Sequence, residues 1–318
     1  MKRMLRIFSL PVGVLVCLGG CTMAPNYIRP EAPVPSAWPQ GPSYREATAP
    51  LPDKAAADIP WQEFFIHDNL RKVIALALEN NRDLRVAVLN IQKARAQYRI
   101  TRADLLPKVD AEGAATYQRL SEDFSGAGTP LDSHQYTVGL GMTSYELDLF
   151  GRVRSLKAQA LEQYLASSEA QRATRLSLVA EVASAYLTLA ADRERLKLAR
   201  ETLESQETSY RLIRSRYQAG ISSALDLNQA RTSVESARVD IARYTTLAAQ
   251  DENALNLVVG SPVPAGLLPG ALSDTLTALK DLPPGMPSDV LLRRPDILQA
   301  EHLLKGANAH IGAARAAF

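Results

Sequence analysis

Hydrophobic residues recur every seven positions over a long stretch in the second half of this chain. A first series falls at Val182, Leu189, Leu196, Leu203, Tyr210 and Tyr217, and a second, after Gly220, at Leu227, Val234, Ile241, Ala248 and Leu255. Heptad spacing keeps one seam of a helix facing a partner helix. We therefore predict an antiparallel helical hairpin over residues 151–260, with a first helix about 100 Å long at about 1.5 Å per residue. Taken alone, such a hairpin is usually a structural coiled coil.

The turn of this hairpin, near residues 219–226, reads AGISSALD. Gly220 can supply the positive φ that ends a helix. Ser223 and Asp226 form the S-x-x-D pattern of a capping box for the next helix. On this pattern alone, Asp226 need be no more than a helix cap.

Two stretches before the hairpin, residues 108–118 and 135–149, alternate apolar and polar residues, as β-strands with two different faces do. The second stretch changes parity near Ser144, where we expect a bulge or bend. Asp110, Glu112 and Thr116 occupy the polar side of the first stretch. A transmembrane strand whose polar side faces a lumen needs about 9–11 such residues. A soluble hairpin with one wet face fits the pattern equally well.

The first 20 residues have the organisation of a secretory signal peptide: basic residues, an apolar run over residues 5–18, and small residues before Cys21. A membrane anchor helix is the alternative, but the run is too short for a stable span. The ending LGGC resembles the bacterial lipobox. That resemblance implies lipidation of Cys21 and, because Thr22 follows in place of Asp, sorting to the outer membrane. Several acyl chains would make the anchoring nearly permanent.

Residues 21–60 are rich in proline, with prolines at positions 25, 30, 33, 35, 39, 42, 50, 52 and 60. Proline fixes φ and removes a backbone donor, so the segment is predicted to be extended. It is either a tether that runs along the outside of the folded body or a disordered linker.

Residues 61–106 contain two predicted helices. Asp68 or Asn69 is expected to cap the first, the pair Asn80-Asn81 interrupts the pattern, and the second ends near Leu105, before Pro107. Residues 261–293 are predicted to be a connector or equatorial segment after the long hairpin.

The last 25 residues, 294–318, resemble the second of those helices when the chain is shifted by 213 positions. Asp83, Ala87 and Arg102, for example, fall on Asp296, Ala300 and Arg315. A period this long predicts a structural duplication with large units. The chain is expected to hold one repeat and the first helix of a second, cut off at its C-terminus.

Four segments together resemble the outer membrane factor family: the lipobox, SYELDLFGRVR after the second strand, RYQAGISSALDLNQA at the hairpin turn, and the final stretch from residue 291. The closest type is the NodT-type lipoprotein branch of TolC/OprM-like channels. This resemblance implies a mainly α fold with transmembrane β: long helical hairpins of a periplasmic α-barrel joined to a β-barrel. Complete members are homotrimers that share one 12-stranded barrel.

The family's function implies a passive exit duct in the outer membrane for drugs, metals or other small solutes. Its expected partners are a periplasmic adaptor, an inner-membrane RND-type pump and outer-membrane lipid. By matching position, Gly220, Ser223 and Asp226 would belong to the tip that docks the adaptor or gates the channel. Asp110, Glu112 and Thr116 would face the lumen.

Other function classes find little support. Without the signal peptide the net charge is near −1, which disfavours nucleic acid as a partner. The four histidines lack metal-ligand spacing, no catalytic or nucleotide-binding motif occurs, and no cofactor is expected. Glu146 and Asp148 are predicted to share one side of a strand as a solvated or lumen-facing pair. The alternatives are a lipid-anchored periplasmic adaptor, a helical scaffold, or a non-functional truncated channel.

Overall fold

The structure of the protein is a computed structural model, and it describes residues 22–31, 33, 59–126, 128–142, 144–272 and 288–317. The predicted signal peptide, Cys21 and most of the proline-rich segment lie outside these residues. The chain divides into two compact units. One comprises Met1–Pro30, Gln92–Ala166 and Ala300–Phe318, and the other Glu31–Ile91 and Ser167–Gln299.

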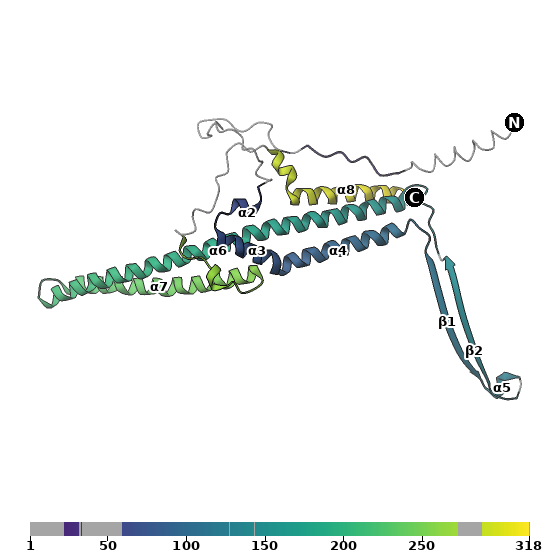
Figure 1. Cartoon of the computed structure of the whole chain (residues 1–318), viewed down its shortest axis with the longest axis horizontal. Coiled ribbons are helices and arrows are strands. Elements are labelled where there is room, and N and C mark those ends of the chain that lie inside the picture. Colours follow the sequence, from purple (N-terminus) through teal and green to yellow (C-terminus); the bar gives the residue numbers. More distant parts are fainter. Residues whose placement is uncertain are drawn as a thin grey trace. The chain divides into compact units, whose positions relative to one another are not determined.

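Helices account for most of the described chain (Figure 1). In chain order the elements are α2 Trp61–Phe64, α3 Asp68–Asn80, α4 Arg82–Ala103, β1 Val109–Leu120, α5 Glu122–Ser125, β2 Leu131–Met142, α6 Arg152–Gln218, α7 Ala224–Val259, η2 Ala265–Leu267, η5 Ser288–Arg293 and α8 Pro295–Arg315. Among the described residues, no helix is both long enough and apolar enough to cross a bilayer.

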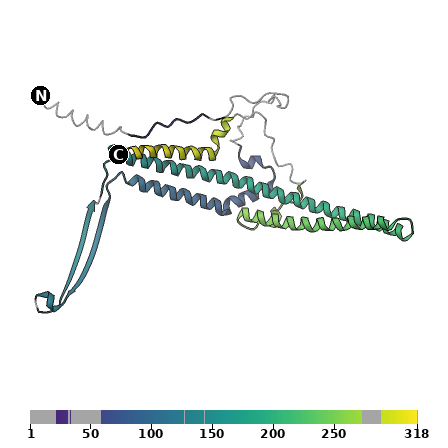
Figure 2. The ribbon, with the colours of Figure 1, turned by 180° about the vertical axis from the view of Figure 1, so that it is seen from behind.

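The heptad seams bring α6 and α7 side by side in the second unit, as both views show (Figures 1 and 2). Burial along the seam falls steadily toward the turn. Val182 and Leu189 are fully buried, whereas Tyr217 is 43% exposed. The predicted hairpin is therefore present, but its two ends are packed very differently.

The buried end of the hairpin forms the core of the second unit together with α3. Tyr186, Leu189 and Leu255 from the hairpin pack with Leu70 and Ile74 of α3. Burial raises the pKa of the Tyr186 hydroxyl to about 12. Fully burying a side chain of this kind stabilises by about 1.5–3 kcal/mol, so this cluster is the main source of stability in the unit.

The break between α3 and α4 falls at Asn81, close to where the sequence predicts it. The Asn81 Oδ1 atom accepts a hydrogen bond from the Leu84 amide at 2.8 Å and so caps α4. The predicted cap of α3 was wrong, because His67 holds that position and its Nδ1 accepts from the Leu70 amide at 3.2 Å. Asp68 already lies inside the helix and pairs with Arg71 and Lys72.

Gly260 ends α7 beside this break. Its φ of +82° is left-handed, and a Cβ atom at this position would lie 2.6 Å from the Asn80 carbonyl oxygen. Glycine is therefore required twice here, by the backbone conformation and by the close approach of α3.

In the first unit, β1 and β2 form an antiparallel hairpin with α5 at its turn (Figure 1). The register pairs Val109 with Met142 at one end and Leu120 with Leu131 at the other. The second strand thus begins earlier than predicted and ends at Met142, before the change in parity. In the described chain both faces of the hairpin are exposed, and Val138 is 89% exposed.

Glu146 and Asp148 were predicted on a strand, and this was wrong. The segment 144–148 has no regular structure, and both carboxylates turn toward the start of α6. Glu146 pairs with Arg152, while Asp148 accepts from the Arg154 amide at 2.9 Å. Arg152 and Arg154 each lie six residues after the acid that they bind. Because these pairs direct the carboxylates to α6, the segment does not continue β2 as the alternation pattern predicts.

The α8 helix packs on the first part of α6 in the same unit. His302 Nδ1 lies 2.7 Å from the Glu162 Oε2 atom, and Gly306 allows close contact with Gln159. An extended N-terminal strap, residues 24–29, lies along α8. Arg29 pairs with Glu301, the Asn308 amide donates to the Pro25 carbonyl at 2.7 Å, and a Cβ on Gly312 would lie 2.6 Å from that of Ala24.

Candidate functional site

The turn between α6 and α7 is the first candidate site, and its backbone is tightly specified. Gly220 has a φ of +77°. Its amide donates to the Tyr217 carbonyl at 2.9 Å, and the Ile221 amide donates to the Arg216 carbonyl at 2.8 Å. These two bonds form a Schellman motif, which satisfies the last carbonyls of α6. Nothing lies within 4 Å of a Cβ atom built on Gly220, so only the backbone requires glycine here.

The start of α7 carries the predicted capping box. The Asp226 amide donates to the Ser223 hydroxyl at 3.1 Å, and the Ser223 amide donates to Asp226 Oδ2 at 2.9 Å. The hydroxyls of Ser223 and Ser222 donate to the same oxygen at 2.7 and 3.0 Å. The Ser223 amide first, and then these hydroxyls, hold the pKa of Asp226 below its ordinary value. Asp226 is thus ionised and fixed in direction at neutral pH.

Apolar side chains surround this cap and remain in solvent. Ile221 is 69% exposed and Leu225 is 65% exposed. A rigid backbone that presents apolar side chains beside a fixed carboxylate is suited to contact with another protein. The structure therefore brings together Gly220, Ser223 and Asp226, and adds Ile221 and Leu225, which have no signal in the capping pattern.

The β-hairpin of the first unit carries the second set of predicted residues. Asp110, Glu112 and Thr116 lie on one face of β1, and their partners in β2 are Gly141, Gly139 and Gln135. The opposite face pairs Ala111 with Leu140 and Gly113 with Val138. One face is therefore polar with small neighbours, and the other is apolar. Cys21, the predicted lipidation site, lies outside the described residues.

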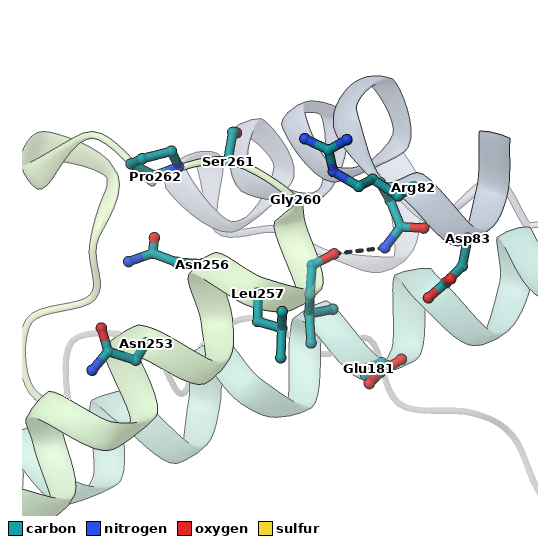
Figure 3. Close-up of a pocket in the computed structure, with 11 residues that line it drawn as sticks. Arg82, Asp83, Glu181, Asn253, Asn256, Leu257, Gly260, Ser261 and Pro262 are labelled. Atoms are coloured by element: carbon teal, nitrogen blue, oxygen red, sulfur yellow. Dashed lines mark hydrogen bonds between the residues drawn. The ribbon is translucent and has the colours of Figure 1, made fainter. Parts of the chain in front are cut away.

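A pocket of about 740 Å³ lies where α7 ends near the start of α4 (Figure 3). Its lining includes Asn253, Asn256, Asp83 and Glu181. The Asn81 amide donates to the Val258 carbonyl at 2.8 Å, and Asn256 Oδ1 accepts from the Val263 amide at 2.7 Å. The side chains of Asn81 and Asn256 thus bind backbone groups and hold the end of α7 in place. We therefore interpret the pocket as a structural feature and not as a ligand site. The described residues contain no cluster suited to a metal ion.

No sequence motif predicts the pair of acidic residues, Asp192 and Asp251, in the second unit. Asp192 of α6 is buried and pairs with Arg195 at 2.5 Å. Burial, and then the neighbouring Asp192 carboxyl, raise the pKa of Asp251 in α7. Two carboxyl groups that share a partly dry site resist simultaneous ionisation.

Comparison with known proteins identifies what this arrangement resembles. The family described as outer membrane efflux protein matches residues 73–261. A probable efflux pump outer membrane protein of Pseudomonas putida, TtgC, is 51% identical over 312 residues, which are 98% of this chain and 64% of TtgC. Outer membrane protein OprJ of Pseudomonas aeruginosa is 45% identical, over 96% of this chain and 62% of OprJ. The chain thus spans about 64% of the length of relatives such as TtgC.

Solved structures show the same fold at similar coverage. A membrane protein from Pseudomonas aeruginosa matches with a TM-score of 0.78 and 45% identity, over 94% of this chain and 65% of that one. The open state of the MtrE outer membrane channel from Neisseria gonorrhoeae matches with a TM-score of 0.76 and 39% identity, over 94% and 64% of the two chains.

Proposed function

Because this chain belongs to the outer membrane efflux protein family, we propose that it acts as the outer-membrane exit duct of a tripartite efflux system. It would conduct drugs, metals or other small solutes passively. One observation supports the proposal above all: the same chain contains a two-faced β-hairpin and a helical hairpin with a 67-residue helix. An open outer membrane channel 39% identical to this chain has the same fold.

The polar face of the β-hairpin is proposed to line the duct. A transmembrane barrel needs one face for lipid and one for a water-filled lumen. Val138 and Leu140 belong to the first, and Asp110, Glu112 and Thr116 to the second. Glycine partners opposite Asp110 and Glu112 leave room for hydrated solutes beside these carboxylates.

The hairpin turn is proposed to dock a periplasmic adaptor or to help close the duct, with Gly220, Ser223 and Asp226 setting its shape. The support is geometric, since the cap is rigid while Ile221 and Leu225 stay exposed. The adaptor in turn would connect the duct to an inner-membrane RND-type pump. A homotrimer of the complete protein is proposed, in line with the family resemblance, because the two strands of the described β-hairpin cannot close a barrel by themselves.

Lipidation of Cys21 is proposed as the anchor. The strap at residues 24–29 supports it, because it holds the chain against α8 three residues after that cysteine. Labelling cells with a palmitate analogue tests the anchor. Label is expected on the native protein and not on a Cys21→Ser variant, and equal labelling of both would refute it.

The duct itself is tested by expressing the protein from its native gene in cells that lack their own efflux channel. We expect faster export of a fluorescent dye and ion conductance from the purified protein in planar bilayers. A lipid-anchored adaptor, the competing function, would give no conductance. Membrane-inserted protein without conductance would therefore reject the duct.

A further inference from the structure

The β-hairpin of the first unit is not held in its direction by packing. Both of its faces are exposed in the described chain, so contact with the helices does not orient it. It is joined to α4 by residues 104–108 and to α6 by the segment between Met142 and Arg152. The direction in which each strand leaves its helix is therefore set within these two crossings.

The crossing into α6 is closed by a helix cap that comes from outside the helix. The Ser155 amide donates to the Gly151 carbonyl at 2.9 Å, so Gly151 holds the N-cap position but has no side chain with which to cap. Asp148 supplies the missing carboxylate. Its two oxygens accept from the amides of Val153 and Arg154 at 3.2 and 2.9 Å. The segment that follows β2 is therefore bound to the N-terminus of α6.

Two arginines in the first turn of α6 strengthen this attachment. Arg154 donates to the carboxylate and to the carbonyl of Asp148, both at 3.2 Å. Arg152 donates through Nε to Glu146 at 2.7 Å. Burial opposes ionisation of Asp148, but the amides of Arg154 and Val153 outweigh it and hold its pKa below the ordinary value. We call the pairs Glu146–Arg152 and Asp148–Arg154 the latch.

The crossing from α4 to β1 is held more loosely. Lys108 Nζ lies 3.4 Å from Asp104 Oδ1, and the two side chains are 63% and 43% exposed. An exposed pair of this kind contributes little to stability. By contrast, the Asp148 side chain in the latch is 11% exposed, so water competes less for its hydrogen bonds. The stronger attachment of the β-hairpin is therefore on the α6 side.

Every contact of the latch is local in sequence. Its partners are five or six residues apart, so the latch can form together with the first turns of α6. The strands of a barrel pair between distant segments and, in the proposed trimer, between chains, and such contacts form late. A hairpin whose direction is already fixed loses less conformational entropy when it joins other strands.

We propose that the latch preorganises the chain for barrel assembly, because it fixes the direction in which β2 leaves α6 before the strands of the duct come together. Glu146 and Asp148 are positioning residues in this step. The inference rests on the proposed function, since it takes the β-hairpin to join a barrel. The latch should therefore change how fast the duct assembles and leave the conductance of the assembled duct unchanged.

Refolding into lipid vesicles tests the latch. The full protein, expressed from its native gene, is unfolded in urea and diluted into phosphatidylcholine vesicles, and assemblies that resist sodium dodecyl sulfate are followed over time. Asp148→Ala and Glu146→Arg should each slow assembly about tenfold, which corresponds to ordering about one more backbone residue during assembly. Adding Arg152→Glu to Glu146→Arg should restore the native rate. Asp68→Ala is the matched control, because it removes an acid from exposed ion pairs within α3 and should leave the rate unchanged.

Two further measurements separate the latch from a general effect on folding. Amide hydrogen exchange in the folded protein should become faster at Val153 and Arg154 in Asp148→Ala, while helical circular dichroism stays unchanged. Each assembled variant should show the native single-channel conductance in planar bilayers.

Several outcomes would overturn the latch. Native assembly rates in Asp148→Ala and Glu146→Arg would do so, as would a failure of the reversed pair to restore the rate. Loss of helical circular dichroism in the variants would show that these residues are needed for α6 itself, and altered conductance would place them in the working duct. If the native protein forms no conducting assembly, the proposed duct fails, and the latch fails with it.

Discussion

The two ends of the α6–α7 hairpin are held by different forces. Near Leu189 and Leu255 the two helices are sealed against α3 by buried apolar side chains. At the turn, the start of α7 is held by exposed hydrogen bonds between its cap residues Ser223 and Asp226. Exposed hydrogen bonds contribute modestly, because water competes for the same groups. Stability is therefore concentrated at the buried end, and the turn can change its surface at little cost to the fold.

The largest expected effect sharpens this contrast at the buried end. Leu189→Ala should lower the free energy of unfolding by about 2–5 kcal/mol, because it leaves a cavity in a fully enclosed site. Urea unfolding followed by helical circular dichroism measures the change. Leu198→Ala in the same helix is the matched control, since Leu198 is exposed and should change stability by less than about 0.5 kcal/mol. Equal losses at the two positions would break the comparison.

The glycines that follow α6 and α7 allow a second test. Gly260→Ala should cost about 1–3 kcal/mol, because the new Cβ would meet the Asn80 carbonyl in addition to straining a positive φ. Gly220→Ala strains a positive φ in open space and should cost about 1 kcal/mol. Urea midpoints of the two variants give the difference. If Gly220→Ala proves the more damaging, the turn is more tightly packed in the assembled protein than in the single chain.

At the turn itself, Ser223→Ala should cost about 1 kcal/mol through the lost cap. The cap also predicts a pH dependence. The pKa of Asp226 is lower in the folded chain, so its contribution is present above the unfolded value of 3.8 and is lost as pH falls through the folded value. The stability difference between Ser223→Ala and the native protein should therefore shrink below about pH 4. A difference that is constant down to pH 2 would exclude the charged cap.

At the turn, function should respond more strongly than stability does. Asp226→Ala is expected to reduce dye export at normal protein levels, because it removes the fixed carboxylate beside Ile221 and Leu225. Asp240→Ala is the matched control, an exposed acid farther along α7. Export that is normal in both variants would leave Asp226 as a helix cap and nothing more.

The smallest effect has the opposite sign. The pKa of Asp251 is raised in the folded chain, so folding takes up protons there and this site destabilises the fold as pH rises above the unfolded value. Asp251→Asn should raise the urea midpoint slightly at pH 8, with the gain disappearing toward pH 4. A lower midpoint at pH 8 would mean that the carboxylate has a favourable partner in the native state.

Local patterns in the sequence predict the regular elements well. The heptads predict α6 and α7, Asn81 separates two helices, and the alternation predicts β1. What escapes prediction depends on competition between partners. His67 caps α3 in place of Asp68, whose carboxylate is drawn to Arg71 and Lys72. The contact between the strap and α8 has no local pattern at all, and the exposure of Ile221 and Leu225 depends on the packing of both helices.

The strap also imposes an order of events on folding. Arg29 and Glu301, which it joins, are 272 residues apart along the chain. Contacts this distant form late, since closing so long a loop is costly in entropy, and a chain is made from its N-terminus onward. Residues 24–29 are therefore synthesised well before α8, the helix against which they pack. The N-terminal segment must remain undocked and accessible while the long helices form. Its docking on α8 is therefore one of the last steps of folding.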